Sequence, residues 1–257
     1  LVLRSGATPG VARGAAVLFT LGPYAAYVHG WTATLADLLW LGLALALAHA
    51  WLSGKARGWR APAFIALGLG LTALALLAKE AVLAIPALLA LAWLLRPGER
   101  GLGWVALGSG VAGLVYLGLR LEVLLAPDPS HAYAFSPLSA PRHWLAYWLF
   151  PLRPSALEVA GLWNASPTHL LVTGLLWLAL VASIARRSPR LALALVVGGS
   201  LALAPALPLG MAANQYAYGF SAWCAACLAL AWPMLRRPGR LLLLFVALVS
   251  SWHGVNV

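Results

Sequence analysis

The stretch APAFIALGLGLTALALLAKEAVLAIPALLALAWLL, residues 61–95, decides the fold class of this protein. It contains two apolar runs, 61–78 and 81–95, which meet at the charged pair Lys79-Glu80. An α-helix rises about 1.5 Å per residue, so a run of about 18 residues can cross roughly 30 Å of hydrocarbon. The stretch therefore predicts two consecutive membrane-crossing helices that reverse direction at the charged pair.

The composition extends this prediction to the whole chain. Of its 257 residues, 63% are hydrophobic and 9% are charged, and the mean hydropathy is +0.88. Soluble domains average roughly 45–50% apolar and about 25% charged residues. A chain of this length cannot hide so much apolar surface from water in a soluble core. We therefore expect an all-α polytopic membrane protein, with residues 1–257 forming one transmembrane domain.

Apolar runs separated by charged gaps predict about nine transmembrane helices. Residues 124–167 form the one sizeable excursion between these runs, and we expect it on the outer face. Within it, RHWLAYWLF (142–150) has the aromatic content of a helix that lies at the membrane–water interface. The predicted crossings lie near 14–29, 33–52, 61–78, 81–95, 102–122, 168–185, 191–208, 217–235 and 240–252.

The 17 basic and 6 acidic residues are distributed unevenly along the chain. Most basic residues lie in gaps that follow an even number of predicted crossings, which places them on one side. Short loops rich in Lys and Arg face the cytoplasm. We do not expect nucleic-acid binding, because no basic surface with interleaved aromatic residues lies outside the apolar runs. The basic clusters are Arg4/Arg13, Lys55/Arg57/Arg60, Arg96/Arg100, Arg186/Arg187/Arg190 and Arg236/Arg237/Arg240.

A few ionisable residues are predicted at the opposite, outer side. Lys79 and Glu80 fit either an interfacial turn, with the lysine reaching the headgroups, or a substrate path. Asp37 lies about one turn inside its predicted helix and has no neighbouring cation in the sequence. A carboxylate there needs a partner, a proton, a metal or a water-filled cavity. Asp37 is therefore a candidate site residue, with a purely structural role as the alternative.

Three arginines depart from the charge asymmetry because they belong at or beyond the outer helix ends. They are Arg120, Arg142 and Arg153. A guanidinium group binds phosphate through paired hydrogen bonds. Contact with lipid headgroups is the alternative for each arginine taken singly. As a set with Lys79, they indicate an anionic lipid substrate.

Other residue types give weaker signals. Cys224 and Cys227 form CAAC inside a predicted crossing, where helix packing is favoured over redox chemistry. The sequon NAS at 164–166 is followed by Pro167. The histidines assigned to the outer side lack the i, i+4 spacing of a helical metal site. They are His29, His131, His143, His169 and His253, with Asp128 nearby in the sequence.

Five segments, in order along the chain, resemble membrane glycosyltransferases of the GT-C superfamily. The similarity is to bacterial and transmembrane-and-TPR O-mannosyltransferase-like proteins. GPYAAYVHGWTATLADLLW resembles HPxxxEAVAWxSGRxDLL, and LLAKEAVLAIPALLALAWLL is similar to LLSKExAVxLPxLLLLxDLL. The matching positions are Pro23, Trp31 and Asp37; Lys79, Glu80 and Pro86; Tyr116 and Arg120 in YLGLRLEVL; Pro151 and Ser155 in YWLFPLRPSA; and Met211, Tyr216, Tyr218 and Ser221 in MAANQYAYGFS.

The resemblance implies transfer of a sugar from a polyprenyl-phosphate donor to a lipid, glycan or protein acceptor. The reaction would take place at the outer face of a bacterial inner membrane, usually with a divalent cation such as Mg, Mn or Zn. Catalytic roles are implied for Asp37 and Glu80, with Asp37 also a possible metal ligand. The substrate-binding set is Lys79, Arg120, Arg142, Arg153, Tyr216 and Tyr218, in which Lys79 and Arg120 would hold the lipid phosphate.

The chain also departs from the family pattern. The family His-Pro is Gly22-Pro23 here, its Glu is Tyr27, its Arg before the Asp is Leu35, and its late Glu-Arg is Asn214-Gln215. The resemblance places the first helix and its acid-bearing loop upstream of Leu1, so we expect the sequence to be part of a longer polypeptide. Two alternative functions therefore remain: a transporter or flippase of an anionic lipid, and a non-catalytic membrane scaffold.

Overall fold

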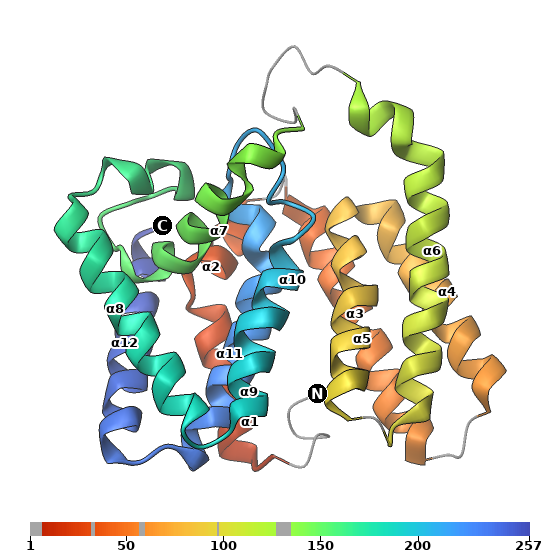
Figure 1. Ribbon diagram of the computed structural model, residues 1–257, viewed down its shortest axis with the longest axis horizontal. Helices are drawn as coiled ribbons and strands as arrows, with labels where there is room; N and C mark the ends of the chain where they lie inside the picture. Colours follow the sequence, from red (N-terminus) through yellow and green to blue (C-terminus); the bar gives the residue numbers. More distant parts are fainter. Residues whose placement is uncertain (1–6, 32–33, 57–59, 97, 127–134) are drawn as a thin grey trace.

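The computed structural model describes residues 7–31, 34–56, 60–96, 98–126 and 135–257, without the side chains of 51–56 and 124–125. Within these residues the chain is helical almost throughout (Figure 1), and its extended pairing is one antiparallel bridge between Phe135 and Leu209. The predicted all-α class is therefore confirmed.

Helices occupy the ranges predicted as crossings. Among the described residues, five helices are long and apolar enough to cross a membrane, and a bent pair would make a sixth. Three shorter apolar helices fill the other predicted ranges, so the count of nine crossings stays a prediction. The main elements are α1 (Pro9–Thr20), α2 (Pro23–Gly30), α3 (Leu35–Ala56), α4 (Ala61–Ala78), η2 (Glu80–Leu83), α5 (Ala84–Leu95), α6 (Arg100–Leu125), α7 (Ala140–Leu149), α8 (Pro167–Ala185), α9 (Pro189–Leu193), η6 (Ala194–Gly198), α10 (Gly199–Leu203), η7 (Asn214–Ala217), α11 (Tyr218–Ala231), η8 (Trp232–Met234) and α12 (Arg237–Asn256).

The long helices alternate in direction between two ends of the molecule. Helices α3, α5, α8 and α11 end at the lower edge of Figure 1, where α4, α6, α9 and α12 begin. The described arginines near these helix ends therefore lie at one end of the protein, which we call the basic end. They are Arg60, Arg96, Arg100, Arg186, Arg187, Arg190, Arg236, Arg237 and Arg240. Lys79, at the end of α4, lies at the opposite end. Which side of a membrane each end faces stays a prediction.

Two hydrophobic clusters organise the described helices. One joins α3, α4, α5 and α6, and the other joins α7 to α12, as the right and left halves of Figure 1 show. Helices α1 and α2 contribute to both clusters, since Tyr24 belongs to the second and Ala25 and Val28 to the first. Helices α4 and α6 approach closely because Gly68 and Gly108 lie at their crossing. A Cβ at Gly68 would overlap the carbonyl oxygen of Val105, and one at Gly108 would overlap that of Ile65. Small residues permit such backbone contact between membrane helices.

The range 14–29, predicted as one crossing, is instead two helices. Helices α1 and α2 meet at a bend of 63°. Pro23 causes the break because its nitrogen carries no hydrogen and its ring clashes with a preceding helical turn. Gly22 is correspondingly extended, with φ −72° and ψ 148°. Gly254 of α12 contacts the carbonyl of Leu21 at this break, and a Cβ there would overlap it.

The predicted interfacial helix is present as α7, but its aromatic residues face protein. Tyr147 and Trp148 are buried. The Trp148 ring lies 4.9 Å from that of Phe220 and 5.3 Å from that of Trp177. The aromatic content of this segment therefore packs the bundle core. The sequence assigned these rings to the membrane–water interface, and the position of α7 relative to a membrane stays a prediction.

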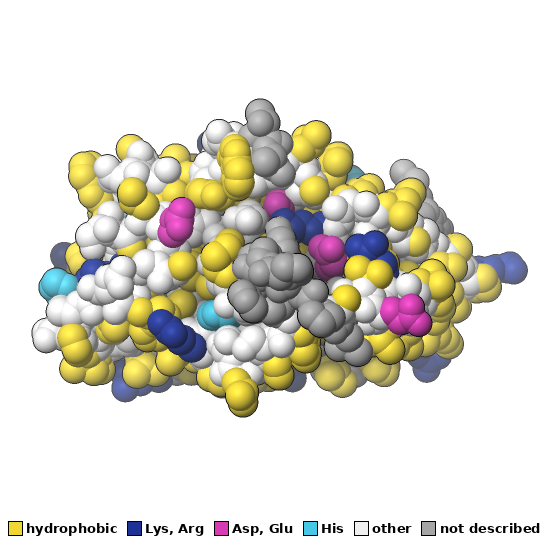
Figure 2. All heavy atoms as spheres, turned by 90° about the horizontal axis from the view of Figure 1, so that it is seen from above, with side chains coloured by type: hydrophobic (Ala, Val, Ile, Leu, Met, Phe, Trp, Pro, Cys, Tyr) yellow, Lys and Arg dark blue, Asp and Glu magenta, His cyan; other side chains and the backbone are white. Residues whose placement is uncertain are grey.

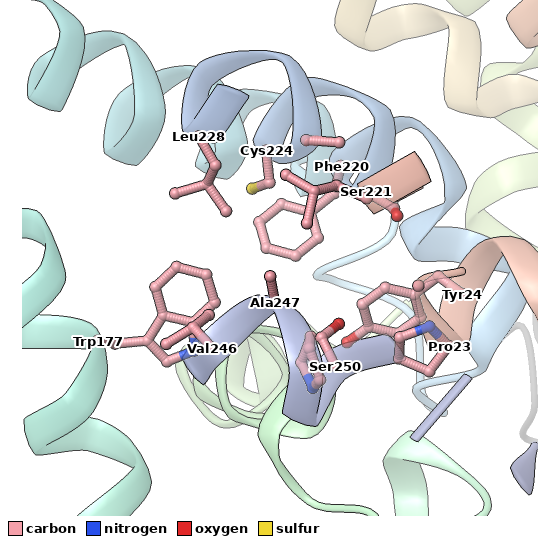
Figure 3. A pocket seen from close by; sticks show the side chains of 14 residues that line it. Pro23, Tyr24, Trp177, Phe220, Ser221, Cys224, Leu228, Val246, Ala247 and Ser250 are labelled. Atoms are coloured by element: carbon pink, nitrogen blue, oxygen red, sulfur yellow. The ribbon is translucent and has the colours of Figure 1, made fainter. Parts of the chain in front are cut away.

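Cys224 and Cys227 are free, buried thiols on α11. Figure 3 shows Cys224 on the wall of a small pocket of about 50 Å³ between α11 and α12, opposite Ala247 and near Phe220 and Leu228. These contacts agree with the packing role predicted for the pair.

Candidate functional site

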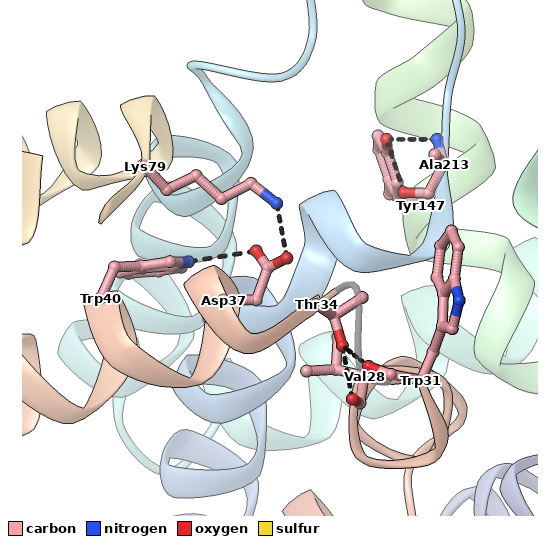
Figure 4. Close-up of polar contacts among 8 residues, drawn as sticks. All are labelled: Val28, Trp31, Thr34, Asp37, Trp40, Lys79, Tyr147 and Ala213. Atoms are coloured by element: carbon pink, nitrogen blue, oxygen red, sulfur yellow. Dashed lines mark hydrogen bonds and ion pairs between the residues drawn. The ribbon is translucent and has the colours of Figure 1, made fainter. Parts of the chain in front are cut away.

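A buried ion pair lies at the end of the molecule opposite the basic end. Asp37 is in the first turn of α3 and is 1% exposed. Lys79 is extended between α4 and η2, with φ −164° and ψ 146°. Its Nζ donates to Oδ2 of Asp37 at 2.5 Å (Figure 4). Lys79 therefore supplies the partner that the buried carboxylate of Asp37 requires.

Trp40 fixes the other oxygen of this carboxylate. Its Nε1 donates to Oδ1 of Asp37 at 3.3 Å, one turn further along α3. The Trp40 ring fits against Gly219 of α11, where a Cβ would overlap the ring. Asp37 is thus held by donors on both oxygens, and the missing side chain at Gly219 makes room for one of them.

Aromatic side chains of the 214–218 segment cover the ion pair. The Nζ of Lys79 lies 5.3 Å from the ring centroid of Tyr216, within range of a cation–π contact. The hydroxyl of Tyr218 shares a hydrogen bond of 2.9 Å with Nε2 of His29, and its ring packs 5.1 Å from that of Phe19. Tyr216 therefore lies against the pair. Tyr218, which interacts electrostatically with Asp37, is anchored to α1 and α2.

A second, more open pair lies next to the first. Glu80 Oε1 and Arg120 Nη2 are 3.9 Å apart, and their side chains are 49% and 47% exposed. Arg120 also lies 5.7 Å from the ring centroid of Tyr116. Exposed ion pairs of this kind contribute only about 0–1 kcal/mol to stability. Because about half of each side chain is exposed, the charges of Glu80 and Arg120 remain accessible to a ligand.

Arg142 and Arg153 have other partners. The guanidinium of Arg142 lies 5.3 Å from the ring centroid of Trp163, and Nη2 of Arg153 donates to Oγ of Ser155 at 3.0 Å. Seen from above, acidic and basic side chains gather near the middle of the face, and further basic side chains lie apart (Figure 2). The structure thus groups Lys79, Glu80 and Arg120, and gives the other two arginines contacts within the excursion.

The surroundings of Asp37 do not fit a metal ion. Both carboxylate oxygens already accept hydrogen bonds. In the part of the chain that the structure describes, no three His, Cys, Asp or Glu side chains are grouped to bind a metal. Asp128 and His131, which the sequence assigns to the outer side, lie outside the described residues. We therefore derive no chemical step through a cation.

Asn214 and Tyr147 also support the site, although sequence reasoning did not assign them to it. The amide of Asn214 accepts from the Val159 nitrogen at 2.9 Å and donates to the Leu157 oxygen at 3.0 Å. It thereby clamps the backbone on either side of Glu158. The Tyr147 hydroxyl donates to the Ala213 oxygen at 3.3 Å and accepts from its nitrogen at 3.2 Å (Figure 4).

These contacts fix the chain just before Tyr216. Burial raises the pKa of Tyr147, so its phenol keeps the proton that it donates.

The sequence contained a signal for Trp40, because position i+3 from Asp37 lies on the same helix face. Asn214 was noted only as a departure from the family pattern, and its partners, which lie 55 and 57 positions away, could not be predicted from the local sequence.

No family model, no curated protein and no solved structure matches this chain. The candidate site therefore rests on its own geometry.

Proposed function

We propose that this protein is a membrane glycosyltransferase that moves a sugar from a polyprenyl-phosphate donor to an acceptor at the outer membrane face. One observation carries the proposal: a buried carboxylate fixes the Lys79 ammonium beside the accessible Glu80–Arg120 pair, at the end opposite the basic clusters. In this proposal the basic end faces the cytoplasm of a bacterial inner membrane, as charge asymmetry favours.

Lys79 and Arg120 would stabilise the departing lipid phosphate. An ammonium carries three N–H donors, and the contact with Asp37 accounts for one of them. The remaining donors can meet phosphate oxygens, while the Tyr216 ring face stabilises the cation. Because cations that are already in place need little reorganisation, they stabilise the charge that develops on the leaving group.

The two carboxylates would have different roles. Asp37 is 1% exposed, so it positions Lys79 and does not contact the acceptor. The Glu80 side chain is 49% exposed and can accept a proton from an acceptor hydroxyl. In this step the acceptor oxygen bonds to the anomeric carbon, the carbon–oxygen bond to the phosphate breaks, and the acceptor proton passes to Glu80.

The test uses the full-length protein in liposomes with a radiolabelled polyprenyl-phosphate hexose or pentose and mixed acceptors. We expect Glu80→Gln to lower transfer at least 100-fold, because a general base contributes roughly 10²–10⁴-fold. Arg120→Gln should also lower transfer. Glu122→Gln is the matched control, since Glu122 is an exposed carboxylate on α6, and it should behave as wild type.

Two results would count against the proposal. Wild-type transfer by Glu80→Gln would remove the assigned base. Absence of transfer by folded wild-type protein with every donor and acceptor class would remove the function itself.

A lipid-phosphate flippase is the second candidate, and the α1–α2 break favours it. Transport sites in membrane proteins are commonly built from discontinuous helices, and these two helices bend by 63°. Movement of a fluorescent polyprenyl phosphate between leaflets, without release of sugar from a donor, would support this function over glycosyl transfer.

A further inference from the structure

A groove lies between α1 and α12, away from the candidate site. It has a volume of about 720 Å³ and extends from Thr8 to Leu21 along α1 and from Arg240 to Ser251 along α12. This volume is within the range of roughly 300–1,000 Å³ that is usual for ligand pockets.

Glycines keep the groove open, and apolar side chains form most of its walls. A Cβ at Gly10 or Gly14 would meet no atom within 4 Å, so α1 presents bare backbone there. Val17 of α1 and Leu248 of α12, which also line the groove, are 52% and 61% exposed. An apolar surface of this kind requires an apolar occupant.

One end of the groove is positively charged. Arg240 donates from Nε to the Trp232 oxygen and from Nη2 to the Pro233 oxygen, both at 3.1 Å, which fixes its guanidinium beside those carbonyls. The N-terminus of α1 is at the same end, because α1 and α12 both begin at the basic end (Figure 1), and Thr8, the N-cap of α1, also lines the groove. Pro9 has no N–H, and the Val11 nitrogen already donates to Thr8 Oγ1. The positive end of the α1 dipole therefore adds to the charge of Arg240 without supplying a full set of free donors.

The length of the groove matches that of an acyl chain. Residues Arg240 to Ser251 of α12 span about 17 Å at roughly 1.5 Å per residue. The hydrocarbon core of a bilayer is about 30 Å thick, so the groove covers about one leaflet. An acyl chain reaches through one leaflet, so its length matches the length of this groove.

We propose that this groove binds an anionic phospholipid of the leaflet at the basic end. Its acyl chain lies between α1 and α12, and its phosphate meets Arg240 and the N-terminus of α1.

The experiment measures lipids retained by the purified full-length protein in native mass spectrometry. The probes are phosphatidylglycerol and phosphatidylcholine with identical acyl chains. Wild-type protein should retain phosphatidylglycerol preferentially. Arg240→Gln should weaken that preference roughly fivefold, the effect of one basic residue near an anionic headgroup. Gly14→Leu should displace both lipids, because its side chain occupies the groove.

Two controls accompany these variants. Arg237→Gln removes an exposed arginine of the same helix that does not line the groove. Gly42→Leu adds a side chain to α3 where a Cβ meets no atom within 4 Å. Both should retain lipid as wild type does.

An unchanged preference in Arg240→Gln, or unchanged retention in Gly14→Leu, would overturn the proposal. So would a Gly14→Leu variant that loses a dimer while it keeps its lipid, because the groove would then belong to a second copy of the chain.

Discussion

The ammonium of Lys79 lies 2.5 Å from the carboxylate of Asp37, although 42 positions separate the two residues. The side chains are 15% and 2% exposed, so water screens this pair far less than it screens Glu80 and Arg120. The contact joins the start of α3 to the end of α4. It also determines where Lys79 can offer its remaining donors.

Removal of one partner should destabilise the protein more than removal of both. Lys79→Met leaves a buried carboxylate without its cation and should lower the free energy of unfolding by about 3–5 kcal/mol. The double variant Asp37→Leu/Lys79→Met should recover most of this loss. Unfolding of the purified protein in detergent measures both. Additive losses in the double variant would show that the pair is not coupled.

Gly219→Leu should displace Trp40 and loosen its hydrogen bond to Asp37. The new side chain overlaps the indole ring, and overpacking of this kind costs about 1–3 kcal/mol. The melting temperature should fall, and Trp40→Leu added to Gly219→Leu should restore part of it. A double variant that melts below Gly219→Leu would contradict the predicted overlap.

Gly108→Leu should separate α4 from α6. Its Cβ overlaps the Ile65 carbonyl, which is backbone and cannot rotate away. Separation would also disrupt the 2.9 Å hydrogen bond from Thr72 Oγ1 to Ser109 Oγ. Gly110→Leu is the control on the same helix, since a Cβ there meets no atom within 4 Å. Comparable melting temperatures for both variants would argue against this crossing.

Asn214→Asp should release the segment around Glu158. An aspartate can still accept from the Val159 nitrogen, but its ionised carboxylate repels the Leu157 oxygen to which the amide donates. Loss of a buried hydrogen bond costs about 1–3 kcal/mol. Limited proteolysis should cut near 156–160 faster than in wild type. The exposed Asn164→Asp is the control, and equal cleavage in both variants would contradict the clamp.

The helices could be predicted from the sequence because their apolar runs are long and their boundaries are charged. The run over 61–78, for example, is α4 as its apolar length indicates. The break between α1 and α2 could also have been predicted from Gly22-Pro23, but the apolar run on both sides concealed it. Burial of α7 was not predictable, because aromatic residues serve a lipid interface and a protein core equally well.

The candidate site was predicted by residue type, but its pairings were not. Asp37 and Lys79 were chosen because charges are rare in apolar runs. Their contact depends on how α3 packs on α4, which no local pattern encodes. For the same reason, Arg120 lies with Glu80 while Arg142 and Arg153 contact Trp163 and Ser155.

The position of Lys79 after α4 has a consequence for biosynthesis. In the predicted topology α3 crosses the membrane. The residue that neutralises Asp37 has not yet been synthesised when α3 leaves the ribosome, and a lone aspartate opposes insertion by up to about 3 kcal/mol. The translocon would therefore release α3 and α4 to the lipid together, as a hairpin whose charges cancel only after its second arm arrives.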